Sequence, residues 1–144
     1  MKEIVFLTNN LGVGGSQKVL VTLAHEAVIS GYNVTIVSLC NNLLLAENLK
    51  SSVKIEVCSN LNSTGGIINR FIISFRLFKY FISNKPLVIH SHLWQIDILY
   101  LIFLKLFFNN RIIHTIHSPG SSYLKRNFFD SINNKIEKCR IKYF

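Results

Sequence analysis

The order of apolar segments constrains the fold more than any other feature of the sequence. Five short runs carry the β-branched residues or the alternation typical of strands, and segments with helical spacing lie between most of them. The expected strands are residues 3–8, 33–39, 53–58, 87–91 and 111–117, and the expected helices are residues 16–30, 67–82, 94–108 and 123–138. Alternating strands and helices imply right-handed crossovers. We therefore predict an α/β fold, a three-layer parallel sheet with helices on both faces.

Composition supports one folded domain and favours anionic partners. The 144 residues are 49% apolar and 16% charged, which allows a core of useful size, and the net charge is +9. Such a charge suits phosphorylated small molecules or an anionic membrane surface. Because no run of five or more cations occurs, we expect no nucleic-acid partner. The longest nearly apolar run, residues 96–108, is too short to span a bilayer.

The cysteines and the N-terminus indicate a cytoplasmic protein. Cys40, Cys58 and Cys139 match no zinc or thioredoxin spacing, so we expect ordinary buried or inert thiols. The apolar run at residues 4–7 is too short for a signal-peptide core. An odd number of cysteines without a signal peptide fits a reducing compartment.

Three loops of unusual composition are expected to meet at one edge of a Rossmann-like sheet. In an open parallel sheet, ligands bind beyond the carboxyl ends of the strands, where the strand order reverses. In the usual order that point lies between the first and fourth strands. The loops at residues 9–15, 90–94 and 117–122 would then converge there.

The first of these loops contains Gly14 and Gly15 and leads into a helix with Ser16 as its expected N-cap. Glycines let a backbone approach a ligand closely, and a helix N-terminus suits a phosphate. A tight turn between strand and helix also needs glycine, so both interpretations stay open. The loop lacks the third glycine of the dinucleotide fingerprint and the Gly-Lys-Ser/Thr of a P-loop. Gly31 is the expected end of the helix.

Histidines mark the second and third loops. His90 and His92 are two residues apart and share one face of a strand, while His114 and His117 close the fifth strand. No Asp, Glu or Cys stands beside them, so we expect no metal. We interpret His90 and His114 as hydrogen-bonded structural residues, and we assign His92 and His117 to a polar pocket. The adjoining loop, residues 118–122, is small and polar and suits sugar hydroxyls, phosphate or an ordinary turn.

The segment at residues 67–82 has apolar residues on every helical face, with Arg70, Arg76 and Lys79 among them. Such a pattern is typical of a half-buried helix or of one that touches a membrane.

Three segments, taken in order, resemble glycosyltransferase family 4 enzymes. Residues 9–19 (Asn-Asn-Leu-Gly-Val-Gly-Gly-Ser-Gln-Lys-Val) are similar to the first loop and helix start of that family. Residues 88–92 (Val-Ile-His-Ser-His) resemble its fourth-strand segment, and residues 113–118 (Ile-His-Thr-Ile-His-Ser) resemble the end of its fifth strand. The spacing of the three segments also fits, and the resemblance covers nearly the whole chain.

The resemblance implies the N-terminal, acceptor-side half of a GT-B fold and a retaining hexosyl transfer in polysaccharide or cell-envelope glycan synthesis. The substrates would be a nucleotide-sugar donor and a saccharide or lipid-linked acceptor, with no separate cofactor. By the same resemblance, the loop at Gly14, Gly15 and Ser16 would approach the donor diphosphate or the acceptor. His92 and Ser118 would line the substrate site, and His117 would be the catalytic residue facing the transferred sugar.

The resemblance also implies a limit. The donor-binding domain of the family has no counterpart in the 144 residues, so we expect one domain over residues 1–144, incomplete at its C-terminal end and inactive alone. Peripheral contact with the inner face of the membrane is a further expectation, and the donor domain would be the natural packing partner. The alternatives are a stand-alone module that binds a phosphorylated sugar or lipid, and a non-functional remnant.

Overall fold

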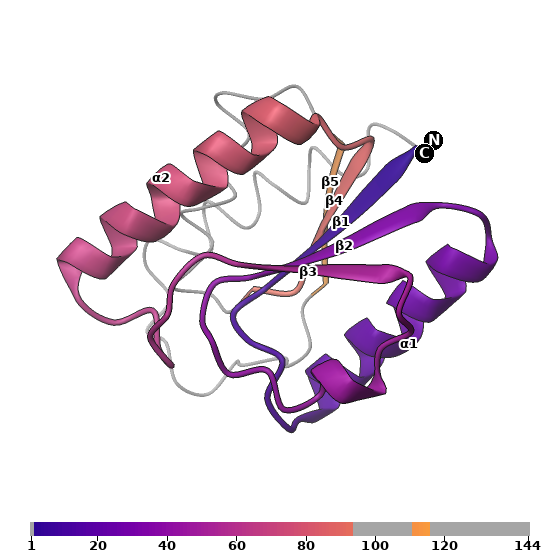
Figure 1. The fold of residues 1–144 in the computed structure, drawn as a ribbon, viewed down its shortest axis with the longest axis horizontal. Coiled ribbons are helices and arrows are strands. Elements are labelled where there is room, and N and C mark those ends of the chain that lie inside the picture. The colour runs from indigo at the N-terminus through magenta and orange to yellow at the C-terminus, as the bar shows by residue number, and fades with distance from the viewer. Residues whose placement is uncertain (1, 94–110, 116–144) are drawn as a thin grey trace, which may run out of the picture.

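The computed structural model describes residues 2–93 and 111–115 (Figure 1). Within them the chain forms five strands, two α-helices and one 3₁₀ turn. In chain order these are β1 (Glu3–Thr8), α1 (Gly15–Ile29), β2 (Asn33–Ser38), η1 (Ala46–Asn48), β3 (Val53–Val57), α2 (Ile67–Asn84), β4 (Val88–Ser91) and β5 (Arg111–His114). The helices expected at residues 94–108 and 123–138 lie outside the described residues.

The strands form one sheet in the order β3-β2-β1-β4-β5, and every neighbouring pair is parallel. β1 pairs with β2 on one side and with β4 on the other, where Leu7 is the partner of Ser91. The strand order therefore reverses between the first and fourth strands, as predicted. The loops that follow β1 and β4 leave the sheet side by side at its carboxyl edge.

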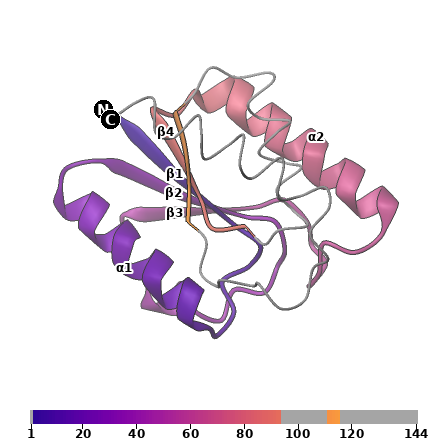
Figure 2. The ribbon, with the colours of Figure 1, turned by 180° about the vertical axis from the view of Figure 1, so that it is seen from behind.

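The two helices cover opposite faces of the sheet, as Figures 1 and 2 show from the front and from behind. Side chains alternate along each strand, so β1 sends Phe6 to one face and Val5 and Leu7 to the other. The cluster on the Phe6 face includes Leu20 and Ala24 of α1, and partly buried Leu23, Ala27 and Val28 pack against it. The cluster on the other face includes Ile73, Leu77 and Phe81 of α2. The predicted three-layer α/β architecture is confirmed.

The expected start of α1 at Ser16 is wrong by one residue. Gly14 is the N-cap with an extended backbone (φ −173°, ψ 164°), and Ser16 lies inside the first turn. The Ser16 hydroxyl donates to Gln17 Oε1 (2.8 Å) instead of capping the helix. Gly31 follows the helix with φ +83°, a conformation that favours glycine, and so ends it as expected.

Both limits of β1 agree with the expectation, and where other boundaries differ from the structure they do so by one to three residues. The amide of Leu39 still donates to Thr8 O (2.9 Å), and Cys58 N donates to Ser38 O (2.8 Å), so both ladders continue one residue past the strand ends. α2 runs two residues further than expected, to Asn84, and Lys85 ends it in the left-handed region (φ 43°). β5 ends at His114, three residues before the expected end.

Two of the three cysteines belong to the core on the α2 face, and neither is in a disulfide. Burial raises the pKa of the Cys58 thiol from 9.0 to about 12, against the opposing effect of the nearby Arg76 cation. A thiol with so high a pKa is inert at neutral pH, as expected. Cys139 lies outside the described residues. Among the helices that the structure describes, none is both long and apolar enough to cross a membrane.

Candidate functional site at the carboxyl edge of the sheet

The loop after β1 is held down by Leu11, whose side chain is fully buried on the α1 face. Its amide donates to Asn42 O (2.8 Å), and its carbonyl accepts from Leu45 N (2.8 Å). These bonds join the loop to the segment that follows β2. The first half of the loop is therefore a fixed part of the fold.

A side-chain network organises the second half of the loop. Asn10 Oδ1 accepts from Gly12 N (2.9 Å) and from Gln17 Nε2 (3.4 Å), and Thr8 Oγ1 donates to Asn10 O (3.0 Å). Asn10 thus connects the end of β1 to the first turn of α1. Sequence reasoning missed this role, although asparagine two residues before a glycine is a common turn-forming arrangement.

The tip of the loop projects outward. Val13 is 74% exposed. A Cβ atom added at Gly15 would meet nothing within 4 Å, whereas one at Gly14 would meet Gln17 Oε1. Open space therefore lies directly over Gly15, where a ligand can approach the backbone.

The N-terminus of α1 at this tip has positive character. No side chain caps the helix, and no acidic residue lies in its first turn. The first amides of a helix have no partner within the helix and carry part of the positive end of its dipole. An anion at this position gains about 0.3–1 kcal/mol from the dipole, and up to about 2 kcal/mol where the site is partly buried.

On the neighbouring strand, His90 and His92 share the Phe6 face, as their spacing predicts. Their ring centroids are 4.5 Å apart, and the Phe6 ring lies 5.3 Å from His90 and 6.1 Å from His92. His92 N donates to Leu7 O (2.8 Å), which holds His92 just beyond the end of β4. The side chain is 6% exposed. His92 therefore lies at the carboxyl edge with its ring buried beside those of Phe6 and His90, and it does not project into solvent.

The other two described histidines of this region are hydrogen-bonded, as predicted for structural residues. His90 Nε2 and Thr115 Oγ1 are 2.8 Å apart and link β4 to the end of β5. His114 Nδ1 and Ser91 Oγ are 3.2 Å apart on the opposite face of the sheet. Both histidines are half-buried. Among residues 2–93 and 111–115, no three His, Cys, Asp or Glu side chains lie together as a metal site would require.

Four of the six predicted site residues lie in the part of the chain that the structure describes. Gly14, Gly15 and Ser16 lie at the start of α1, which follows β1, and His92 lies just past the end of β4, the strand beside β1. The structure brings these four to one edge of the sheet. The chain also leaves β5 at that edge, where Thr115 N donates to Ser91 O (2.9 Å). His117 and Ser118 lie outside the described residues.

Comparison with known families identifies the family to which the chain belongs. The family model described as Glycosyltransferase Family 4 matches residues 13–141. The chain is a member of glycosyltransferase family 4. The matched region contains all six predicted site residues. No curated protein matches the chain.

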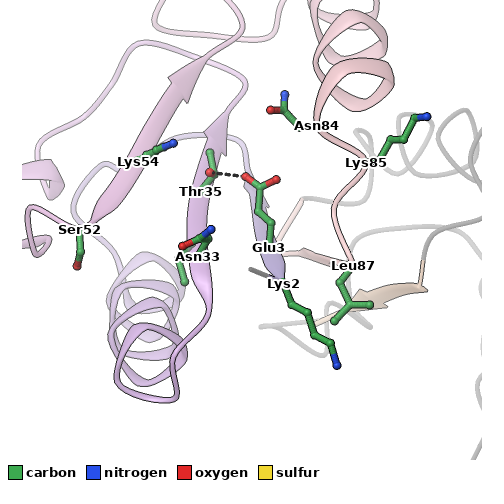
Figure 3. Close-up of a pocket in the computed structure, with 10 residues that line it drawn as sticks. Lys2, Glu3, Asn33, Thr35, Ser52, Lys54, Asn84, Lys85 and Leu87 are labelled. Carbon is green, nitrogen blue, oxygen red and sulfur yellow. Dashed lines mark hydrogen bonds between the residues drawn. The ribbon is translucent and has the colours of Figure 1, made fainter.

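The family 4 domain has a cavity of about 470 Å³ at the opposite, amino edge of the sheet (Figure 3). Lys2, Lys54 and Lys85 lie around it, and Figure 3 shows that their side chains do not converge on a common point. Its one carboxylate, Glu3 Oε1, accepts from Thr35 Oγ1 (2.8 Å) and from Tyr80 OH (3.2 Å). These bonds tie α2 to the sheet. Ligands of open parallel sheets bind at the other edge, so we place the candidate site at the carboxyl edge.

Proposed function

We propose that this domain forms the acceptor side of an enzyme that transfers a hexosyl group from a nucleotide-sugar to a saccharide or lipid-linked acceptor. One observation carries the proposal: in a chain of glycosyltransferase family 4, an open, uncapped helix N-terminus and His92 follow the two neighbouring strands between which the strand order reverses. Such a point is where open α/β sheets bind their ligands.

Each part of the site has a role in this proposal. The amides at Gly15 and Ser16 bind a phosphate or sugar oxygen, because nothing covers them and the helix dipole favours negative charge. His92 supports the acceptor side of the pocket. His117 faces the transferred sugar, and Ser118 binds a hydroxyl or phosphate oxygen. The donor is a substrate, and no separate cofactor is needed.

The finer parts of the proposal follow from the resemblance. Transfer retains the anomeric configuration and serves polysaccharide or cell-envelope glycan synthesis in the cytoplasm. The second domain of such enzymes holds the nucleotide-sugar, and the glycine loop of this domain contacts the donor diphosphate. We therefore expect this domain alone to bind a nucleotide-sugar through its diphosphate without completing transfer.

Ligand binding by the chain tests the proposal without the second domain. We expect calorimetric titration with uridine, guanosine and adenosine diphosphate glucose to show saturable binding to at least one of them. A Gly15→Glu substitution should weaken that binding at least about tenfold, because it replaces open space with a negative charge while the helix dipole tolerates an acid there. Circular dichroism should show an unchanged fold.

Gly65→Glu is the matched control. Gly65 is an exposed loop glycine where an added Cβ makes only an ordinary contact, 3.5 Å from Ser63 Oγ. It adds the same charge in the segment between β3 and α2, outside the glycine loop, and should leave binding intact. Equal losses in the two variants would contradict the assignment of the site, and binding of sugar phosphates but of no nucleotide-sugar would favour a stand-alone binding module. Release of nucleoside diphosphate by the chain alone would contradict the need for a second domain.

A further inference from the structure

The loops that follow β1, β2 and β3 contain no charged residue, although the chain carries a net charge of +9. They are residues 9–14, 39–45 and 58–66. The parallel register places Thr8, Ser38 and Val57 side by side, so the three loops leave the sheet together at its carboxyl edge. The first charged residues along the chain after each loop belong to α1, η1 and α2, and they are Lys18, Glu47 and Arg70. The three loops therefore form a neutral surface on a basic domain.

Side-chain amides supply the polar groups of this neutral surface. Asn41 and Asn42 follow β2, and Asn60 and Asn62 follow β3. Asn42 is half-buried and the other three are exposed, and in the described part of the chain none of the four side-chain amides is hydrogen-bonded. A Cβ atom added at Gly12 would lie 2.9 Å from Asn42 Nδ2, so this amide adjoins the glycine loop. Each amide offers both donors and an acceptor, whereas a lysine or arginine can only donate.

Each of the three loops also exposes one large apolar side chain. These are Val13 (74% exposed), Leu44 (66%) and Leu61 (55%). Amides beside apolar side chains suit a sugar ring, which carries hydroxyls around its rim and C–H groups on its faces. A phosphate or carboxylate would lose hydration here without gaining a loop cation in return, which is unfavourable. Arg76 approaches the third loop from α2, but its guanidinium donates to Cys58 O (2.9 Å).

Hydrogen bonds hold the three loops together. The second loop shares backbone hydrogen bonds with the first, and Asn41 N donates to Leu61 O (3.0 Å) in the third. Within the third loop, Ser59 Oγ donates to Asn69 Oδ1 (2.6 Å), and Asn69 Nδ2 donates to Ser63 O (2.9 Å). Asn69 is a buried residue of α2, so the helix fixes the loop. A backbone that is already fixed lowers the entropic cost of binding a ligand.

We propose that this neutral surface binds an uncharged oligosaccharide, and that the acceptor of the transfer reaction is such a glycan and not a phosphorylated sugar or lipid. The acceptor role rests on the proposed function. From β1 to β3 the surface spans two strand spacings, about 10 Å, which is about the length of a disaccharide. It therefore contacts sugar units beyond the one at the reaction site, and longer glycans bind more tightly than a monosaccharide.

Titration of the isotope-labelled full chain with uncharged glycans in NMR tests the proposal. The probes are the pentasaccharides of glucose, galactose, mannose and N-acetylglucosamine, each compared with its monosaccharide. We expect at least one pentasaccharide to shift the side-chain NH₂ signals of Asn41, Asn42, Asn60 and Asn62. Its affinity should be the same at low and high salt, because salt screens charges and leaves bonds between neutral groups unchanged. The monosaccharide should bind at least about fivefold more weakly, the value of one hydrogen bond.

A pair of double variants separates these amides from asparagines elsewhere. Asn60→Ala, Asn62→Ala should weaken binding of the pentasaccharide at least about fivefold, because amides that bond the glycan are lost. The fold should persist, since both side chains are exposed and neither bonds a described residue. The control is Asn33→Ala, Asn48→Ala, which removes two exposed asparagines outside the three loops and should bind the pentasaccharide normally.

Three results would overturn the proposal. The first is that none of the four pentasaccharides shifts the asparagine NH₂ signals, and the second is an equal loss of binding in the two double variants. The third is binding of glucose 1-phosphate that high salt abolishes, without binding of any neutral glycan, which would assign this edge to an anionic acceptor. Because no nucleotide is present, failure of the glycans leaves the nucleotide-sugar titration unaffected. Glycan binding without nucleotide-sugar binding would contradict sugar transfer and retain the neutral surface.

Discussion

Gly15→Ala should make the domain more stable and its ligand binding weaker. Gly15 is the first residue of α1, and a Cβ atom added there meets nothing within 4 Å. Alanine in a helical conformation without a clash is favoured over glycine, chiefly because the unfolded chain loses freedom. We therefore expect the free energy of unfolding to rise by about 0.5–1 kcal/mol, and the melting temperature to rise by about 1–4 °C.

Binding should change in the opposite direction, because the new methyl group occupies the space through which a ligand approaches the backbone. The loss should be roughly tenfold, the value of one hydrogen bond to a charged group. Urea denaturation gives the first quantity, and nucleotide-sugar titration of the same samples gives the second. Lower stability would show that Gly15 is not in open helical space. Higher stability with unchanged ligand binding would show that this loop is not part of the ligand site.

The remaining predictions concern the loop, the core and the link between α2 and the sheet. Gly12→Ala should lower stability by about 1 kcal/mol in urea denaturation, since its Cβ would lie 2.9 Å from Asn42 Nδ2 and 3.0 Å from Asn10 Oδ1; an increase like that of Gly15→Ala would contradict this. Tyr80→Phe should cost about 1 kcal/mol through the lost bond to Glu3 Oε1 (3.2 Å) and leave ligand binding unchanged. Because burial raises the pKa of Cys58 from 9.0 to about 12, the folded state keeps a proton that the unfolded state loses above pH 9. Stability should therefore fall between pH 9 and 12, by up to about 1.4 kcal/mol per pH unit, and a Cys58→Ala variant with an identical slope would contradict the assignment.

The spacing of apolar residues and the residue types of each segment were sufficient to predict the strands of the sheet. The β1 limits agree with the structure, and the pairing of β1 with β4 follows from the usual strand order of a Rossmann-like sheet. The start of α1 was missed because Gly14 caps the helix with its backbone while Ser16, the better capping residue by type, turns its hydroxyl to Gln17. Side-chain chemistry alone cannot distinguish these two arrangements.

Contacts between distant residues explain what the sequence could not predict about the site. Leu11 reads as a loop residue, and its burial depends on bonds to Asn42 and Leu45, more than thirty residues away. For α2, the apolar pattern left both helix faces equivalent, and only packing shows that Ile73 and Leu77 face inward while Phe71 and Phe75 face outward. The position of His90 and His92 on one face of the sheet was predictable from their spacing; their rings are tilted by 39° to each other.

Mapping ligand contacts by amide chemical shifts in NMR would locate the site in solution. When the nucleotide-sugar that binds in calorimetry is added to the labelled chain, the largest shifts should fall on Gly14, Gly15, Ser16 and His92, at the carboxyl ends of β1 and β4. Shifts that instead concentrate on Lys2, Lys54 and Lys85 would place the ligand in the cavity at the amino edge and contradict the assignment of the sugar-transfer site.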